Sequence, residues 1–298
     1  MSKNIQSHLS LFAVNLIYGV NFLIAKGLMP ALIGPSGFIV IRVIGATLMF
    51  GLLWLFLSRE KITNKKDLGL IALCAVFGVA VNQLFFFNGL CLTSPINASI
   101  IMVSTPVLVL GISSVLIKER ITGRKLVGLL LGTLGAVALI LTRGGTSTGS
   151  SSLAGDIMVF LNALSYAIYL VIVKPLMLKY KPLTVITYVF LFGLPMVIPF
   201  GWTEFRAVNW NVFNTGQWLA IAFVVIFVTF LAYLLNTFAL KYVTASVSSV
   251  YIYMQPFVAT VLMYIIAVGF GGPSVDLTLV KVLCGVSIFS GVFLVTRK

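Results

Sequence analysis

Residues 95–106 read PINASIIMVSTP, and residues 245–256, at a constant offset of 150, read ASVSSVYIYMQP. Both stretches are apolar with small residues at matching positions, and each ends in a proline. A second match, at an offset of 148, pairs residues 18–26 with residues 166–174. The chain therefore contains an internal duplication that covers both of its halves.

The composition places the chain in a membrane. Apolar residues make up 60% of the 298 positions, charged residues make up 9%, and the mean hydropathy is +1.14. A soluble domain with this balance would lack a polar coat. Apolar runs of about twenty residues, enough to cross a ~30 Å hydrocarbon core as helices, lie at 9–29, 37–57, 68–88, 95–117, 125–142, 154–174, 183–202, 217–238, 245–268 and 277–296. We predict an all-α integral membrane protein with ten transmembrane helices.

Each repeat holds five predicted helices, an odd number, so the two repeats must enter the bilayer in opposite orientations. We predict a first five-helix repeat at 1–142, a Gly/Ser/Thr-rich linker at 143–153 and a second, inverted five-helix repeat at 154–298. Inverted repeats of this kind build secondary transporters, in which the substrate binds near the bilayer midplane where the repeats meet.

The positive charge follows the predicted topology. The chain has 20 Lys and Arg against 6 Asp and Glu, a formal net charge of +14. With a cytoplasmic N-terminus, fifteen of the basic residues fall in cytoplasmic segments and three, Arg143, Arg206 and Lys281, in external ones. This asymmetry satisfies the positive-inside rule. It predicts that both termini are cytoplasmic, and it explains the basic charge without a nucleic-acid partner.

Polar and aromatic side chains recur at helical spacing on one face of six predicted helices. Lipid-facing surfaces are apolar, so these faces indicate either interhelical hydrogen bonds or a shared cavity, which we favour. The candidate substrate-binding residues on these faces are Tyr18, Asn21, Phe22, Asn82, Gln83, Phe86, Ser99, Met102, Thr105, Asn162, Tyr166, Tyr169, Tyr233, Asn236, Ser248, Tyr251 and Gln255.

Lys26 and Arg42 are the two basic residues that the predicted topology leaves within the membrane, and both are further candidates for substrate binding. One interpretation is that they snorkel to the interface or bond to carbonyls at helix ends. The other is that they attract an anionic group of the substrate, such as a carboxylate. The sequence leaves both open.

Repeat-related prolines, Pro106 and Pro256, lie near the centres of the fourth and ninth helices. A proline removes one intrahelical hydrogen bond and bends its helix, so we predict a hinge at each. Gly128, Gly132 and Gly135 give the fifth helix a small face for close helix contact, either within the bundle or in a homodimer. The protein is therefore expected to be a monomer or a homodimer.

These motifs resemble the EamA-type transporters of the drug/metabolite transporter superfamily. The resemblance rests on Tyr18-Gly19-x6-Lys26, Arg42-x3-Ala46 and the stretch Pro95–Leu141, which includes Ser104-Thr105-Pro106, Glu119-Arg120-Ile121-Thr122 and Gly128. It implies ten helices, a bacterial cytoplasmic (inner) membrane location and the export or exchange of small metabolites. The second repeat departs from the pattern, because residues 269–272 (GFGG) stand where an acidic turn is usual.

Catalytic groups are scarce. The six carboxylates fall at predicted helix ends or in loops, and the one histidine, His8, borders the first helix. We therefore expect no catalysis, metal or cofactor, and transport without a membrane carboxylate as ion carrier. The leading hypothesis is a secondary transporter that exports amino acids or related metabolites by alternating access, with membrane lipids as its surroundings. Alternatives are a lipophilic drug or amine exporter, a channel, and a lipid- or glycan-modifying enzyme.

Overall fold

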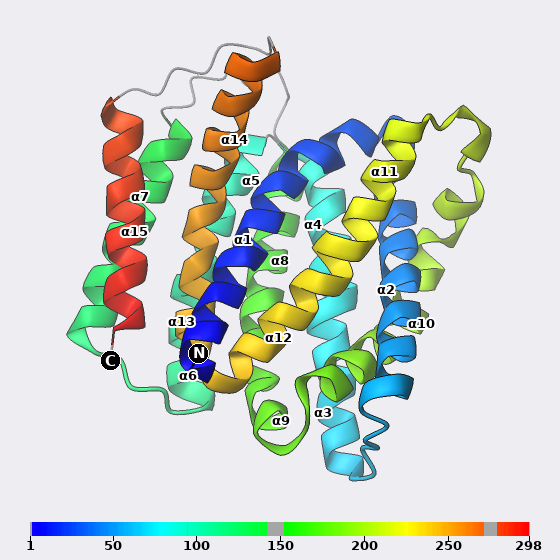
Figure 1. The fold of residues 1–298 in the computed structure, drawn as a ribbon, viewed down its shortest axis with the longest axis horizontal. Helices are drawn as coiled ribbons and strands as arrows, with labels where there is room; N and C mark the ends of the chain where they lie inside the picture. The colour runs from blue at the N-terminus through cyan, green and yellow to red at the C-terminus, as the bar shows by residue number, and fades with distance from the viewer. Residues whose placement is uncertain (1, 94, 142–151, 271–278, 298) are drawn as a thin grey trace.

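The computed structural model describes residues 2–93, 95–141, 152–270 and 279–297, and in these residues the chain is a bundle of helices (Figure 1). The first half forms five spans. They are α1 (Lys3–Leu28), α2 (Pro35–Leu57), the continuous α3 (Lys65–Ala75), η1 (Val76–Ala80) and α4 (Val81–Leu92), the broken α5 (Pro95–Met102) and α6 (Thr105–Leu116), and α7 (Gly123–Leu141).

The second half forms five more spans. They are α8 (Leu153–Ile172) with α9 (Lys174–Lys179), α10 (Pro182–Arg206), the continuous α11 (Thr215–Phe223), η3 (Val224–Leu231) and α12 (Ala232–Tyr242), the broken α13 (Ala245–Val250), η4 (Tyr251–Tyr253) and α14 (Met254–Phe270), and α15 (Leu279–Thr296). A short 3-10 turn, η2 (Trp210–Val212), lies between α10 and α11. Seven helical stretches among the described residues are long and apolar enough to cross a membrane. The predicted ten-helix fold is confirmed, while most of the predicted linker (143–153) lies outside the described residues.

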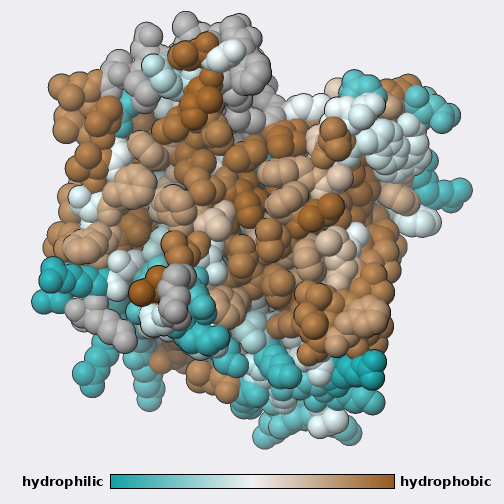
Figure 2. Space-filling view, viewed as in Figure 1, coloured by the Kyte–Doolittle hydropathy of each residue, from teal (hydrophilic) through white to brown (hydrophobic). Residues whose placement is uncertain are grey.

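The two halves exchange their packing partners. In the first half α1 packs against α12 and α14, and in the second half α8 packs against α4 and α6. Two equivalent pairs pack directly on each other, α2 on α10 and α7 on α15. Because α1 begins and α15 ends at the same end of the bundle (Figure 1), the chain crosses it an even number of times. Figure 2 shows an apolar band over the middle of the helices and hydrophilic residues gathered at that end.

The glycines of α7 pack inside the bundle. A Cβ added to Gly128 would lie 2.7 Å from the carbonyl oxygen of Gly291 in α15, and one added to Gly135 would lie 2.9 Å from that of Cys284. Gly132 faces the ring of Tyr253. These small residues let two backbones approach closely, so this face of α7 is occupied by its own chain.

Carboxylates at the ends of α2 and α10 connect the two halves. Glu204 accepts a hydrogen bond from the backbone N–H of Gly37 in the first turn of α2 (2.9 Å). Glu60, beyond the end of α2, accepts one from the N–H of Lys181 at the start of α10 (2.9 Å). Each helix thus receives a negative charge at its N-terminus, where charge and helix dipole attract, from the other half of the protein.

Glu119, in the loop between α6 and α7, forms an ion pair with Lys125 (2.8 Å). Burial raises the pKa of this carboxyl, but interactions with Lys125, Thr244 and Ser246 lower it by more, so the pKa lies below its usual range. The loop is thereby fastened to the start of α13 in the other half. A carboxyl with a depressed pKa stabilises the fold above its unfolded-state pKa of about 4.3, and this contribution is lost as the pH falls through the folded-state pKa.

We expect Glu119→Gln to reduce the free energy of unfolding by about 1.5–3 kcal/mol at pH 7, the usual contribution of a hydrogen bond to a charged group. The difference from the parent protein should begin to shrink as the pH falls below about 4.3, the unfolded-state pKa, and should be lost as the pH falls through the lower folded-state pKa of the parent carboxyl. Melting temperatures of both proteins in detergent, measured from pH 7.5 to pH 3.5, check this. A difference that stays constant over the whole range would contradict it.

Candidate functional site

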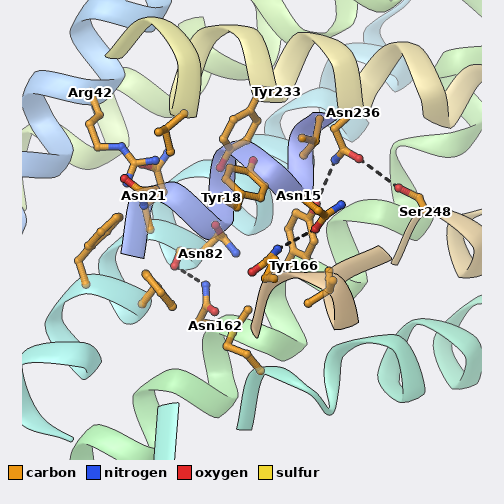
Figure 3. A pocket seen from close by; sticks show the side chains of 18 residues that line it. Asn15, Tyr18, Asn21, Arg42, Asn82, Asn162, Tyr166, Tyr233, Asn236 and Ser248 are labelled. Atoms are coloured by element: carbon orange, nitrogen blue, oxygen red, sulfur yellow. Dashed lines mark hydrogen bonds between the residues drawn. The ribbon is translucent and has the colours of Figure 1, made fainter. Parts of the chain in front are cut away.

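A cavity of about 110 Å³ lies between the two halves of the bundle (Figure 3). Its walls come from α1, α2, α4 and α5 of the first half and from α8, η3, α12, α13, η4 and α14 of the second. On α1 the lining runs from Val14 to Asn21, the middle of a helix that extends from residue 3 to residue 28. The cavity is therefore deep in the bundle and is shared by both repeats.

Neutral polar side chains dominate the lining. Seven amides and three phenols surround the cavity, together with one serine, one arginine and six apolar side chains. The polar members are Asn15, Asn21, Asn82, Gln83, Asn162, Asn236, Gln255, Tyr18, Tyr166, Tyr233, Ser248 and Arg42. None of the carboxylates that the structure describes lines it.

Thirteen of the candidate residues line this one cavity. They are Tyr18, Asn21, Arg42, Asn82, Gln83, Phe86, Met102, Asn162, Tyr166, Tyr233, Asn236, Ser248 and Gln255. The side chains of three other candidates, Phe22, Lys26 and Ser99, lie outside the described part of the structure. Whether the thirteen bind a substrate stays a prediction, but the structure does bring them together from seven spans.

Three candidates point elsewhere. Thr105 is buried, and its hydroxyl donates to the carbonyl of Met102 (2.7 Å), where α5 ends and α6 begins. Tyr169 packs against Gly78, whose added Cβ would lie 2.5 Å from its ring. Tyr251 turns toward α1, and its hydroxyl lies 2.8 Å from Nδ1 of His8. These three residues share helical faces with residues of the cavity lining. Each polar face extends beyond the cavity, and there its side chains contact neighbouring helices instead.

Five residues of the cavity lining were not predicted from the sequence. Asn15 could have been found, because it lies three residues before Tyr18 on the same helical face, and its amide oxygen accepts a hydrogen bond from Gln255 (2.8 Å). The other four carry no polar signal and become part of the cavity only through packing. They are Val14, Phe87, Val228 and Ile252.

Hydrogen bonds link the cavity lining across spans, and two of them lie at the end formed by Asn236 and Ser248 (Figure 3). Asn236 donates to the hydroxyl of Tyr166 (3.0 Å) and accepts from the hydroxyl of Ser248 (3.1 Å). Asn162 donates to the backbone carbonyl of Asn82 (2.7 Å). These bonds join the sixth span to the third, eighth and ninth, so the lining is organised by its own side chains.

Arg42 lies at the other end of the cavity, and its side chain is buried in protein. It is 4% exposed. Its Nε donates to the hydroxyl of Thr229 in η3 (3.0 Å), and its guanidinium carbon lies 4.6 Å from the ring centroid of Phe87. No described carboxylate pairs with it. Charged side chains within membrane helices are rare and usually pair with another group or face a cavity, and Arg42 faces this one.

Helix irregularities surround the cavity in repeat-related pairs. The third and eighth spans contain π-helical segments, η1 and η3, whose first residues are 148 positions apart. Carbonyls of η1 are satisfied from the second half, by the hydroxyls of Ser165 (to Phe77, 2.6 Å) and Tyr233 (to Gly78, 3.3 Å). π-helical turns often mark functional sites, and irregular backbone at membrane depth is tolerated where protein surrounds it.

The two predicted hinges fall where the fourth and ninth spans break. Pro106 lies in the first turn of α6, after a tight turn at residues 103–104, and Pro256 lies in the first turn of α14, after the 3-10 segment η4. A proline in the first turn of a helix removes a backbone N–H that would have no acceptor within the helix. The prolines therefore mark the start of a new helical segment instead of bending a continuous helix.

Comparisons with known proteins agree with this architecture. The profile of the EamA-like transporter family matches residues 6–141 and again residues 153–297. An uncharacterized transporter of Archaeoglobus fulgidus is 30% identical over 257 residues, 85% of this chain and 86% of that protein. The uncharacterized transporter YyaM of Bacillus subtilis is 25% identical over 265 residues, 88% of this chain and 86% of that protein.

The same fold occurs in a solved structure. A protein crystal structure with 19% sequence identity superposes with a TM-score of 0.75 and covers 97% of this chain and 95% of its own. At that identity the likeness concerns the fold alone. Two family matches account for nearly the whole chain, one for each half, and they confirm a membrane transporter and not an enzyme. The chain belongs to the EamA-like transporter family, within the drug/metabolite transporter superfamily.

Proposed function

We propose that this protein is a secondary transporter that exports or exchanges small organic metabolites, amino acids or related compounds first, by alternating access. The observation that carries the proposal is the polar cavity at mid-length of the helices, lined by both repeats. A site at the interface of inverted repeats can be exposed to either side when the repeats rock against each other.

The size and chemistry of the cavity support a small polar solute. Its volume of about 110 Å³ is below the ~300–1,000 Å³ of sites that enclose drug-sized ligands. Seven amides supply both donors and acceptors. The alternative, a lipophilic drug or amine exporter, would gain from the three tyrosine rings through cation–π contacts, but it would place a cation beside Arg42 without a carboxylate to offset the repulsion.

The proposed location is a bacterial cytoplasmic membrane with both termini in the cytoplasm. The excess of Lys and Arg on loops at the end of the bundle that carries the termini supports this orientation. In this orientation α5–α6 and α13–α14, the two broken spans, cross the bilayer in opposite directions.

Countertransport in proteoliposomes tests the proposal. Vesicles loaded with an unlabelled solute would be given labelled amino acids, nucleobases or amines, with and without a pH gradient. We expect saturable exchange of one solute class, amino acids first, accelerated by the same solute on the opposite side. Uptake that does not saturate and shows no acceleration would indicate a channel. Exchange confined to lipophilic amines would favour the alternative.

Alternating access also gives the two breaks a function as hinges. We expect Pro106→Ala and Pro256→Ala each to slow exchange roughly tenfold, equivalent to about 1.4 kcal/mol in the activation barrier, because alanine allows the two segments to join into one stiffer helix. Folded protein, measured as melting temperature in detergent, should change little. The control is Pro195→Ala, since Pro195 lies inside the continuous helix α10. Equal loss of folding and exchange in the first two variants would disprove the hinges.

A further inference from the structure

The unsatisfied polar atoms of this protein gather around the cavity. In the described residues, seven buried side-chain polar atoms have no hydrogen-bond partner, and five of these belong to residues that line the cavity. They are Nη1 of Arg42, Oδ1 of Asn21, both amide atoms of Gln83 and Oδ1 of Asn162. Leaving a buried polar group unpaired costs about 1–3 kcal/mol, so a cluster of such atoms in one place indicates partners that arrive from outside.

Two of the unpaired groups, on Arg42 and Asn21, lie at the opposite end of the cavity from the hydrogen-bonded Asn236 and Ser248. Figure 3 shows Arg42 and Asn21 at one end of the cavity and Asn236 and Ser248 at the other, with Tyr18 between them. At the second end the side chains bond to one another, as Asn236 does to Tyr166 and Ser248. That end is complete without a ligand, whereas the end at Arg42 is not. A polar head group of the solute belongs at the incomplete end.

Charge specifies the head group. Arginine is always protonated. Arg42 is held by a hydrogen bond to Thr229, and its guanidinium carbon lies 4.6 Å from the ring centroid of Phe87 and 5.8 Å from that of Phe38. No described carboxylate lines the cavity or pairs with Arg42. The planar guanidinium fork matches a carboxylate in a bidentate arrangement. An anionic ligand would therefore supply the missing counter-charge.

The unpaired amides that line the same cavity add a second requirement. Asn21 and Gln83 offer buried oxygens that lack a donor, so a solute with an N–H or ammonium group next to its carboxylate would satisfy both kinds of atom. A decarboxylated amine would bring a cation to Arg42 and leave the guanidinium unpaired, which disfavours it twice.

We propose that Arg42 binds the carboxylate of the transported solute, and that the amide oxygens of Asn21 and Gln83 accept hydrogen bonds from a donor group beside it. The solute class is a small carboxylate that carries such a donor, as an α-amino acid does, and its remaining side chain points toward Tyr166, Asn236 and Ser248. This assignment rests on the proposed function, and it adds which chemical group is recognised and where.

The test uses the purified full chain in detergent and measures the rise in melting temperature that each ligand causes. This rise reports binding and does not require transport. The twenty L-amino acids would be compared with their amides and their decarboxylated amines. We expect at least one acid to bind tenfold or more tightly than its own amide and amine. Arg42→Gln should abolish this acid-to-amide ratio, and Arg42→Lys should keep the preference but weaken binding.

Two further variants separate recognition from folding. Thr229→Val removes the hydrogen bond that positions Arg42 and should reduce the ratio several-fold in a protein that keeps the charge. Ser248→Ala, at the complete end, should leave the ratio unchanged even where all ligands bind more weakly. This pair keeps the test decisive if Arg42→Gln does not fold.

Three results would overturn the assignment: an amine or amide that binds as tightly as its acid, a ratio preserved in Arg42→Gln or Thr229→Val, or no stabilisation by any acid in the panel. Countertransport in proteoliposomes distinguishes this failure from that of the proposed function. Saturable exchange of solutes without a carboxylate would support the proposed carrier and contradict the assignment of Arg42 as the carboxylate-binding residue. Binding that is specific for acids, without any exchange, would support the assignment of Arg42 and contradict the proposed carrier.

Discussion

Replacing Gly201 by alanine is expected to destabilise the packing between the two halves of the protein strongly. A Cβ at this position would lie 2.2 Å from the carbonyl oxygen of Ser36 and 2.6 Å from Cγ2 of Val40. The first contact is with backbone, so neither helix can relieve it by turning a side chain. Because α2 and α10 are equivalent helices that join the two repeats, their separation would also disturb the cap that Glu204 provides for α2.

We expect Gly201→Ala to reduce the free energy of unfolding by about 3 kcal/mol, the upper end of the usual cost of overpacking. The measurements are the melting temperature in detergent and the fraction of monodisperse protein after purification. Gly51→Ala is the matched control, since Gly51 lies in α2, the helix that Gly201 packs against, and no atom lies within 4 Å of a Cβ added to it. Equal stability of the two variants would contradict the close contact between α2 and α10 at Gly201.

Replacing Asn236 by leucine is expected to cause the largest loss of transport outside Arg42. The amide of Asn236 is 4% exposed and bonds to both Tyr166 and Ser248, so it connects the sixth, eighth and ninth spans at the cavity. Leucine has a similar size but leaves both hydroxyls unpaired, at about 1–3 kcal/mol for each. We expect countertransport per folded molecule to fall tenfold or more, because the lining loses the arrangement that this network maintains.

The duplication supplies a matched control for this variant. Asn88 is the residue 148 positions earlier, at the equivalent place in the third span, and its amide bonds to Ser36 and not to any cavity residue. Asn88→Leu should therefore retain exchange per folded molecule even where the protein is less stable. Comparable loss of exchange in both variants would show that the effect arises from a buried amide in general, and not from the cavity network.

Most of the cavity lining could be predicted from the sequence. Thirteen of the eighteen cavity residues were predicted, and nine of the thirteen are amides or phenols at helical spacing. The reason is that a polar group in a membrane bundle must face protein or a cavity. The same rule could not separate Tyr166 from Tyr169, which lie one turn apart on one face; only the latter packs onto Gly78. Apolar lining residues such as Val228 and Ile252 were invisible to it.

Arg42 shows most directly what residue patterns in the sequence cannot decide. Its position inside a predicted helix was read from the sequence, but both interpretations, snorkelling to the interface and binding an anion, were compatible with a charge near one helix end. Burial to 4% and the contacts with Thr229 and Phe87 come from η3 and α4, remote in sequence from α2. A cation's environment is a property of the helices around it.

The sequence by itself determined the class of protein, the ten spans and the duplication. Hydropathy and helix length respond to the bilayer, which acts on each segment separately, so local composition is sufficient for them. The tertiary structure alone decided which polar faces meet, which hydrogen-bonding groups satisfy one another and which remain unpaired at Arg42, Asn21 and Gln83. Those outcomes depend on how helices from opposite halves pack, and packing joins residues that no local pattern connects.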